Sequence, residues 1–335
     1  MALDVKVTIN LSKPVGKVGT WIPLIYVPVD ETTEAVYNEC SNLDDVVSAG
    51  YAAEGTEAYA VAKLIFMQDN APAKIAILKG GKSITSVLPA YLKKDWRQLI
   101  VLGDYDATLA AYIETTDKMY FTHFATKDAL TAAYTATSNS LKGFARTVAV
   151  LYTGTEVAYP EAAVVGATAG FKAGSFTYKN VVVKGIVALD LSDEDIKTIH
   201  ENGAITILEK AGDTVTSEGK AASGDYIDVI DSKDYIIQNI AYKTQKVLNN
   251  NAKIPYTDVG IAMLESATLE ALVDGYNNGM IADSEDGTPA YSTSFALRKD
   301  TSETDRGNRE YPYGSFKFEL AGAIHTVEVE GEIEV

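Results

Sequence analysis

Apolar and polar residues alternate at both ends of the 335-residue chain. The apolar positions are Val5, Val7, Ile9 and Leu11 near the start, and Val327, Val329, Ile333 and Val335 near the end. Polar residues separate the first set and glutamates the second, which gives the period of two that is typical of a strand with one apolar face. The edges of such strands pair either within the fold or with other chains. The pattern therefore predicts an amphipathic strand at each end.

Short apolar segments alternate with helical patterns over residues 20–152. Strands are predicted at residues 20–29, 74–78, 98–102, 118–122 and 146–152. Helices are predicted at residues 42–53, 57–67, 83–93, 107–115 and 127–137. This order is typical of an α/β layer whose strands are mainly parallel.

The middle of the chain continues this pattern with two helices and a strand. Residues 160–170 form a predicted helix rich in Gly and Ala, which indicates close packing against another backbone. Ser192 begins the next predicted helix, with acidic residues in its first turn, and Asn202-Gly203 ends it. A strand is expected at residues 204–209, and a loop or hairpin at residues 212–224.

The last third of the chain has a different organisation. A strand is predicted at residues 226–230, and Ser232 is the predicted cap of a long helix that ends at Asn249–Asn251. A second helix (258–278), an acidic loop (283–289) and strands at 291–297, 316–320 and 324–335 follow. The sequence thus predicts an α/β layered domain, then a compact α+β C-terminal domain, with extended N- and C-terminal strand arms.

Composition limits the classes of partner. The net charge of −17 argues against non-specific binding to nucleic acid, which needs clustered Lys and Arg. No apolar run is long enough to span a membrane, so we expect neither nucleic-acid binding nor membrane insertion. The single cysteine, Cys40, cannot form an internal disulfide.

Motifs for catalysis, cofactors or metals are weak. The stretch Lys79-Gly80-Gly81-Lys82-Ser83 resembles the end of a phosphate-binding loop, but the first glycine of that motif is replaced by Ala76. His123, His200 and His325 lack the spacing of metal ligands, and the acidic loop lacks that of a calcium site. We therefore expect no catalytic residue, cofactor or metal. An α/β enzyme, hydrolase-like or nucleotide-binding, is the alternative interpretation.

Two stretches, Leu191 to Ile281 and Glu303 to Val335, resemble the contractile tail sheath proteins of bacteriophages and phage-tail-like bacteriocins. The shared features are a helix that ends in Asn-Gly before a strand, as at Asn202-Gly203, and a helix that ends in the turn Asn278-Gly279-Met280-Ile281. The closing strand of that family also matches residues 323–335.

The resemblance implies a structural subunit that polymerises as stacked hexameric rings around a tail tube and contracts to drive the tube through a cell envelope. Terminal arms would add strands to a small sheet in the C-terminal domain of neighbouring copies. Expected partners are further copies, the tail tube, baseplate and tail terminator proteins, in a virion or tail-like particle assembled in the host bacterial cytoplasm. The implied domains are an N-terminal linker arm (1–20), an α/β sheath region (21–215), a C-terminal domain facing the tube (216–322) and a C-terminal linker strand (323–335).

Two lysines on the predicted long helix are candidates for contact with the tube. Lys243 and Lys246 are three residues apart and so share a helix face. The resemblance places helices of the C-terminal domain against the tube, where these lysines would meet acidic residues. A solvated helix face is the alternative interpretation of the pair.

Overall fold

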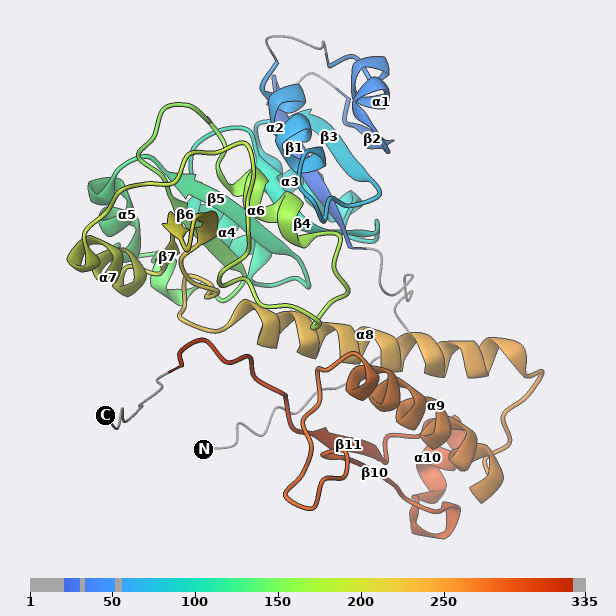
Figure 1. Ribbon diagram of the computed structural model, residues 1–335. Helices are drawn as coiled ribbons and strands as arrows, with labels where there is room; N and C mark the ends of the chain where they lie inside the picture. The colour runs from blue at the N-terminus through green and yellow to red at the C-terminus, as the bar shows by residue number, and fades with distance from the viewer. Residues whose placement is uncertain (1–20, 31–33, 52–55, 328–335) are drawn as a thin grey trace, which may run out of the picture.

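The computed structural model describes residues 21–30, 34–51 and 56–327. The predicted N-terminal strand lies outside these ranges, as do residues 328–335 of the predicted C-terminal strand. The described chain forms an α/β body and a C-terminal unit. The long helix α8 (Ile227–Asn250) runs along the body and connects the two parts (Figure 1).

A seven-stranded sheet forms the centre of the body. Its strands are β1 (Ile22–Val29), β2 (Val36–Cys40), β3 (Ile75–Gly81), β4 (Trp96–Val101), β5 (Met119–Phe124), β6 (Thr147–Leu151) and β7 (Ala204–Ile205). They lie in the order β2-β3-β1-β4-β5-β6-β7. All neighbouring pairs are parallel except β2 and β3. All six residues of β4 are buried, which is typical of a parallel strand covered on both faces.

Helices cover both faces of this sheet. They are α1 (Leu43–Ser48), α2 (Glu57–Phe66), α3 (Ile84–Val87), α4 (Ala107–Ile113), α5 (Lys127–Tyr134), α6 (Glu161–Thr168) and α7 (Asp193–Glu201). Side chains of α1, α2 and α6 pack with Ile25 and Ile77 on one face. Those of α3, α4, α5 and α7 pack with Leu24 and Leu78 on the other. The body is therefore a three-layer α/β/α arrangement.

The small residues of α6 allow it to approach α2 closely, as its composition predicted. A Cβ atom added to Gly166 would lie 2.7 Å from the backbone of Ile65, and one added to Gly170 would lie 2.1 Å from the carbonyl oxygen of Asn70. Every residue of α6 is buried. Glycine at these two positions is thus required by the packing of one backbone against another.

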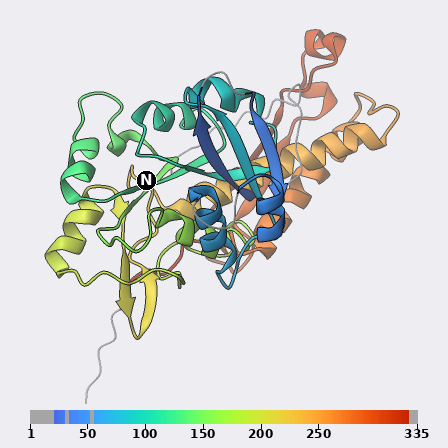
Figure 2. The same cartoon turned by 90° about the horizontal axis from the view of Figure 1, so that it is seen from above.

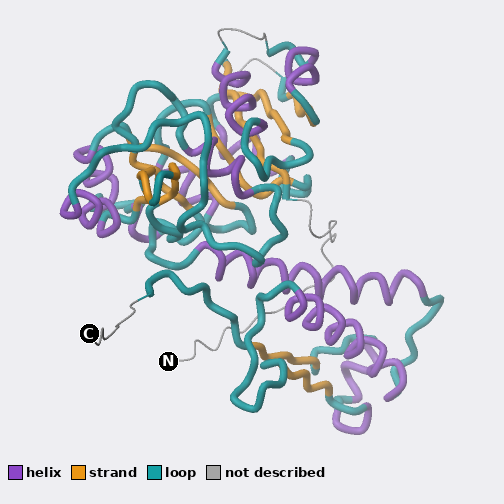
Figure 3. The backbone as a smooth tube through the Cα atoms, in the orientation of Figure 1, coloured by secondary structure: helices purple, strands orange, loops and turns teal. Residues whose placement is uncertain are grey.

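After the sheet, the chain forms a hairpin of β8 (Ile207–Lys210) and β9 (Asp213–Thr216), which projects from the body in Figure 2. The C-terminal unit then consists of α8, α9 (Asp258–Asn277), β10 (Tyr291–Phe295), α10 (Glu303–Asn308) and β11 (Gly314–Phe318). Three short 3-10 helices complete the described elements: Leu88–Ala90, Leu141–Gly143 and Arg298–Asp300. Figure 3 shows β10 and β11 as a separate strand pair beside the helices.

The predicted fold class, α/β followed by α+β, is confirmed. Helix α7 begins as predicted, because the Ser192 side chain accepts a hydrogen bond from the Asp195 N–H group. It ends at Asn202-Gly203, where Gly203 adopts a positive φ of 69°.

Four local predictions were wrong. Residues 226–230 are not a strand, and Ser232 is not a cap, because α8 already begins at Ile227 and Ser232 lies buried inside it. The helix predicted at 83–93 is reduced to α3 and a 3-10 turn that contains a proline near its start. Residues 324–327, the described part of the last predicted strand, form no strand. Strand β2 was not predicted.

Candidate functional site

The C-terminal unit contains a two-stranded antiparallel sheet. Tyr291 lies opposite Phe318, and Phe295 lies opposite Gly314. Two strands alone are marginally stable in water, and no further strand of the described chain pairs with either outer edge of β10 or β11. The two edges are therefore candidate sites for strand addition.

The hydrogen-bond pattern shows which backbone groups face outward. Glu319 donates to the Ala290 carbonyl, and Ala296 donates to that of Tyr313. Hydrogen-bonded and non-hydrogen-bonded pairs alternate along an antiparallel ladder. The backbone N–H and C=O groups of the odd-numbered residues of β11 therefore point toward β10. The backbone groups of Gly314, Phe316 and Phe318 face away from it. No described residue donates to them or accepts from them.

The sheet has one apolar face and one polar face. Tyr291, Phe316 and Phe318 are half-buried and pack against the cluster formed by α8 and α9. The exposed face carries Ser292, Ser294, Ser315 and Lys317. An added strand with alternating residues would extend both faces, because its apolar side chains would join the aromatic layer. The sequence of each predicted arm has this alternation.

Helices α8 and α9 support the sheet and are cross-linked by polar contacts. Lys243 forms ion pairs with Glu270 at 3.2 Å and Asp274 at 3.0 Å, and Asn239 donates to Asp274 at 2.9 Å. Lys246 is exposed and lies over the ring of Tyr242. Of the two candidate tube-contacting lysines, Lys243 is therefore engaged within the chain.

A buried ion network attaches α8 to the α/β body. Arg97, on β4, contacts Asp231 at 2.5 Å and Asp234 at 2.7 Å. Arg146, just before β6, binds both carboxylate oxygens of Asp234, at 2.7 and 3.0 Å. Arg97 also donates to the carbonyl oxygen of Asp117. Arg97, Asp231 and Asp234 are no more than 6% exposed, so two positive and two negative groups balance one another away from water.

Neighbouring side chains complete the network. The Tyr178 hydroxyl donates to Asp231 at 3.1 Å, and the ring of Trp21 lies 4.7 Å from the Arg97 guanidinium. Burial acts against the charge of Asp234, yet Arg97 and Arg146 hold the pKa of that carboxyl below its ordinary value. Burial also opposes the charge on Arg97, but the two aspartates raise its pKa above the ordinary value.

Sequence reasoning missed this network, although one signal was present. Asp231 and Asp234 are three residues apart and thus lie on one face of a helix. Asp231 also lies four residues after the buried Ile227 and so on the same side of α8, where acids would ordinarily be absent. Their shared partner Arg97 lies 134 residues before Asp231 and 137 residues before Asp234, so local spacing cannot identify it.

Residues 321–327, the described part of the C-terminal segment, contact the body through one side chain, that of His325. Within residues 321–327, only His325 is not exposed. Its Nε2 lies 2.8 Å from the Thr177 hydroxyl, its Nδ1 lies 3.5 Å from Glu218, and its ring meets Tyr226 edge-on. Val327, the one described residue of the predicted C-terminal arm positions, is 73% exposed. The other arm positions lie outside the described residues.

The body also contains a buried acid–base pair at the carboxyl end of β5. Glu161 is 1% exposed, and its carboxylate lies 3.0 Å from Nδ1 of His123. Burial raises the pKa of Glu161, with His123 opposing this rise. Burial opposes protonation of His123, but Glu161 raises the pKa of that ring above its ordinary value. Within the described residues, no group of three or more His, Cys, Asp or Glu side chains is arranged to hold a metal ion.

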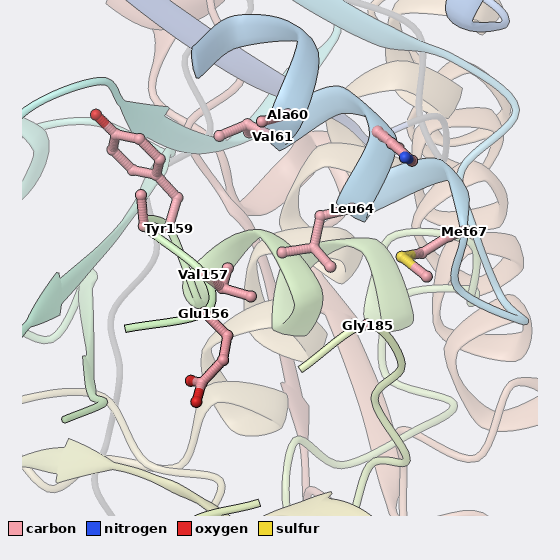
Figure 4. Close-up of a pocket in the computed structure, with 10 residues that line it drawn as sticks. Ala60, Val61, Leu64, Met67, Glu156, Val157, Tyr159 and Gly185 are labelled. Carbon is pink, nitrogen blue, oxygen red and sulfur yellow. The ribbon is translucent and has the colours of Figure 1, made fainter. Parts of the chain in front are cut away.

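A pocket of about 370 Å³ lies between α2 and residues 156–159. Val61, Leu64 and Val157 provide much of its wall, and the carboxylate of Glu156 turns away from them (Figure 4). That carboxylate instead accepts a hydrogen bond from the Tyr152 hydroxyl at 3.1 Å. The pocket thus presents a mainly apolar wall, with Lys63 and Glu156 as the charged residues among those that line it.

Comparison with known proteins identifies the fold. Residues 227–333 match the family of the C-terminal domain of E217 tail sheath protein gp31-like proteins. No curated protein matches the chain by sequence. None of the helices in the described part of the chain is long and apolar enough to cross a membrane.

Three solved structures superpose on nearly the whole chain. The sheath complex of an extracellular contractile injection system, PVC, in its contracted state has a TM-score of 0.73 and 12% identity, and covers 100% of this chain and 98% of its own. The contracted helical sheath of the anti-feeding prophage (AFP) has a TM-score of 0.70 and 12% identity, with 99% of each chain covered. A chain of the AFP baseplate has a TM-score of 0.71 and 14% identity, over 100% and 99%.

The resemblance to contractile tail sheath proteins is confirmed by these two findings. The fold of the whole chain is that of contractile sheath proteins, and its C-terminal unit matches a tail sheath domain family. The relatives with this fold are components of sheaths and of a baseplate, which are structural assemblies.

The ion network predicts a large effect of removing one charge. Asp231→Asn leaves Arg97 and Arg146 to share the single carboxylate of Asp234, so one buried positive charge is uncompensated and we expect the free energy of unfolding to fall by about 3–5 kcal/mol. Arg97→Met combined with Asp231→Leu should lose clearly less than the sum of the two single losses. Urea unfolding of the parent, Asp231→Asn, the two single variants of the cycle and their double variant measures both quantities, and additive losses would contradict the pairing.

The anchor at His325 predicts a local effect. A spin label at Val327→Cys should become more mobile when His325→Ala removes the one side chain of residues 321–327 that is not exposed, while Cys40 stays unlabelled because it is buried. Ile324→Ala is the matched control, since Ile324 is 84% exposed and its removal should leave the label unchanged. Equal label mobility in the His325→Ala protein and its parent would show that His325 does not hold the segment.

Proposed function

We propose that this protein is the subunit of a contractile tail sheath, which polymerises as stacked hexameric rings around a tail tube. The observation that carries the proposal is the β10–β11 sheet, whose two outer edges pair with no described strand. The chain supplies two alternating segments, at residues 5–11 and 327–335, that suit such edges. Heterologous contacts of this kind generate open helical arrays.

The proposed division of the chain follows from this role. Residues 1–20 and 323–335 are linker arms, residues 21–215 form the sheath body, and residues 216–322 form a C-terminal domain beside the tube. An arm of about five residues forms about four to six backbone hydrogen bonds, each worth roughly 0.5–1.5 kcal/mol net. Such links hold neighbouring copies together while their folded bodies move.

Contraction of the sheath would drive the tube through the envelope of a target cell. In this proposal the extended sheath is kinetically trapped and the contracted one has the lower free energy. The tail tube, the baseplate and the tail terminator are the partners, and the assembly forms in the host bacterial cytoplasm as part of a virion or a tail-like particle. A chain in the AFP baseplate structure shares the fold, which supports the proposal that the baseplate is a partner.

Loss of either arm should abolish assembly. Deletion of residues 1–11, or of the last ten residues, is expected to leave a folded monomer with unchanged circular dichroism and no tubes in negative-stain microscopy. Val329→Pro tests the same link with one residue, because proline removes a ladder N–H group. Val329→Thr is its matched control, since Thr keeps both that group and the β-branched shape. Truncated chains that still form sheaths would overturn the strand-addition model.

The tube contact of the long helix is tested at Lys246. Lys243 is unsuitable, because its loss would also break the ion pairs to α9. Lys246→Glu should reduce the yield of tube-filled sheaths and leave assembly without tube unchanged. Lys253→Glu, an exposed lysine just beyond α8, is the charge-matched control. Equal yields of tube-filled sheaths from all three proteins would show that Lys246 does not face an acidic tube.

A further inference from the structure

The two open edges of the small sheet differ in length. Beyond Phe318 the β11 chain continues to pair on its inner side, where Ala321 donates to Met280 and Ala282 donates to Glu319. Ile281 and Leu320 form an antiparallel bridge there. Residues 280–282 thus lie in line with β10, and the outward groups of β11 extend without interruption to Leu320.

The edge on the β10 side is interrupted. Between residues 280–282 and β10 the chain leaves the sheet as a loop at residues 283–289, whose base is closed by the bridge between Asp283 and Pro289. The β11 edge is therefore the longer continuous one, and the β10 edge is short and has this loop beside it.

The two edges also differ in charge. Lys317, exposed on β11, is the one charged residue within the ten residues of β10 and β11, and it forms no ion pair with a described residue. Glu319 follows on the same face, so the β11 edge carries no net charge. The loop beside β10 carries Asp283, Glu285 and Asp286.

The negative charge of this loop persists over a wide pH range at one residue. The hydroxyls of Ser284 and Thr288 donate to Asp286, and so does the Thr288 backbone N–H group. These hydrogen bonds lower the pKa of Asp286 to about 2. An acidic strand placed beside β10 would therefore lie next to a negatively charged loop, and like charges in that position are unfavourable.

The two predicted arms also differ in charge. With its apolar residues on the aromatic face of the sheet, the C-terminal arm would place Glu328, Glu330, Glu332 and Glu334 on the exposed face. The N-terminal arm would place Asp4, Lys6, Thr8 and Asn10 there, which carry no net charge. The C-terminal arm, with four glutamates and no cation on this face, therefore gains more than the N-terminal arm from a lysine on the neighbouring strand and loses more beside an acidic loop.

We propose that the β11 edge binds the C-terminal arm of a second copy, that the β10 edge binds the N-terminal arm of another copy, and that Lys317 selects between the arms. This inference rests on the proposed function, because it assigns each arm to one edge of the same sheet. Opposite charges on adjacent strands stabilise their pairing and like charges destabilise it, so the choice follows from the positions of a few charged side chains.

Charge reversal tests the role of Lys317. Lys317→Glu should raise the protein concentration needed for half-maximal assembly about three- to tenfold, since a favourable cross-strand pair becomes unfavourable. Adding Glu330→Lys to the same chain should restore assembly, and Lys142→Glu, a charge-matched change on the body, should leave it unchanged. Restored assembly supports the proposal. A Lys317→Glu protein that assembles at the parent concentration overturns it.

Cysteine cross-linking identifies the edge directly. Ser294 and Ser315 lie opposite each other on the exposed face, one on each strand. Ser315→Cys combined with a cysteine at Glu328, Glu330 or Glu332 should give a disulfide between subunits in assembled polymers, whereas Ser294→Cys with the same partners should not. Polymers that cross-link through residue 294, or through neither residue, overturn the assignment and leave the proposed function intact. Assembly that persists without the arms contradicts the proposed function instead.

Discussion

The buried pairing of Arg97 and Arg146 with Asp231 and Asp234 is the interaction on which the arrangement of this protein depends. Removing a charge from water costs several kcal/mol unless a partner compensates it. Helix α8 can place its two aspartates inside the body only in the position where both arginines meet them. The network therefore specifies how α8 lies against the body, and so where the rest of the C-terminal unit stands.

Helix α8 thereby belongs both to the α/β body and to the C-terminal unit. The first half of α8 is fixed in the body, and its second half packs and pairs with α9, which supports β10 and β11. The sheet is held in place, yet it consists of two strands whose edges remain open to other strands. In a sheath subunit this arrangement separates a folded unit that moves as one piece from arms that keep copies connected. Strand addition suits this connection because its hydrogen bonds use backbone groups.

Local patterns predicted the α/β alternation, the cap of α7 at Ser192 and the close packing of α6, because each depends on residues near one another in the chain. The predicted start of α8 was wrong because it too was inferred from neighbouring residues alone. The five residues from Tyr226 are too few to distinguish a strand from a helix, and the evidence for a helix lies in the distant Arg97. The anchoring role of His325 was missed, since a single histidine gives no signal until Thr177 and Glu218 are placed beside it. The alternation at the chain ends stays a prediction.

A helical reconstruction of assembled protein by electron cryo-microscopy tests the central claim most directly. We predict that each β10–β11 pair is flanked by two further strands, which are residues 5–11 and 327–335 contributed by two other copies, while α8 keeps its contacts with Arg97 and Arg146. A polymer in which the sheet remains two-stranded, or in which both added strands belong to the same copy as the sheet, would contradict it.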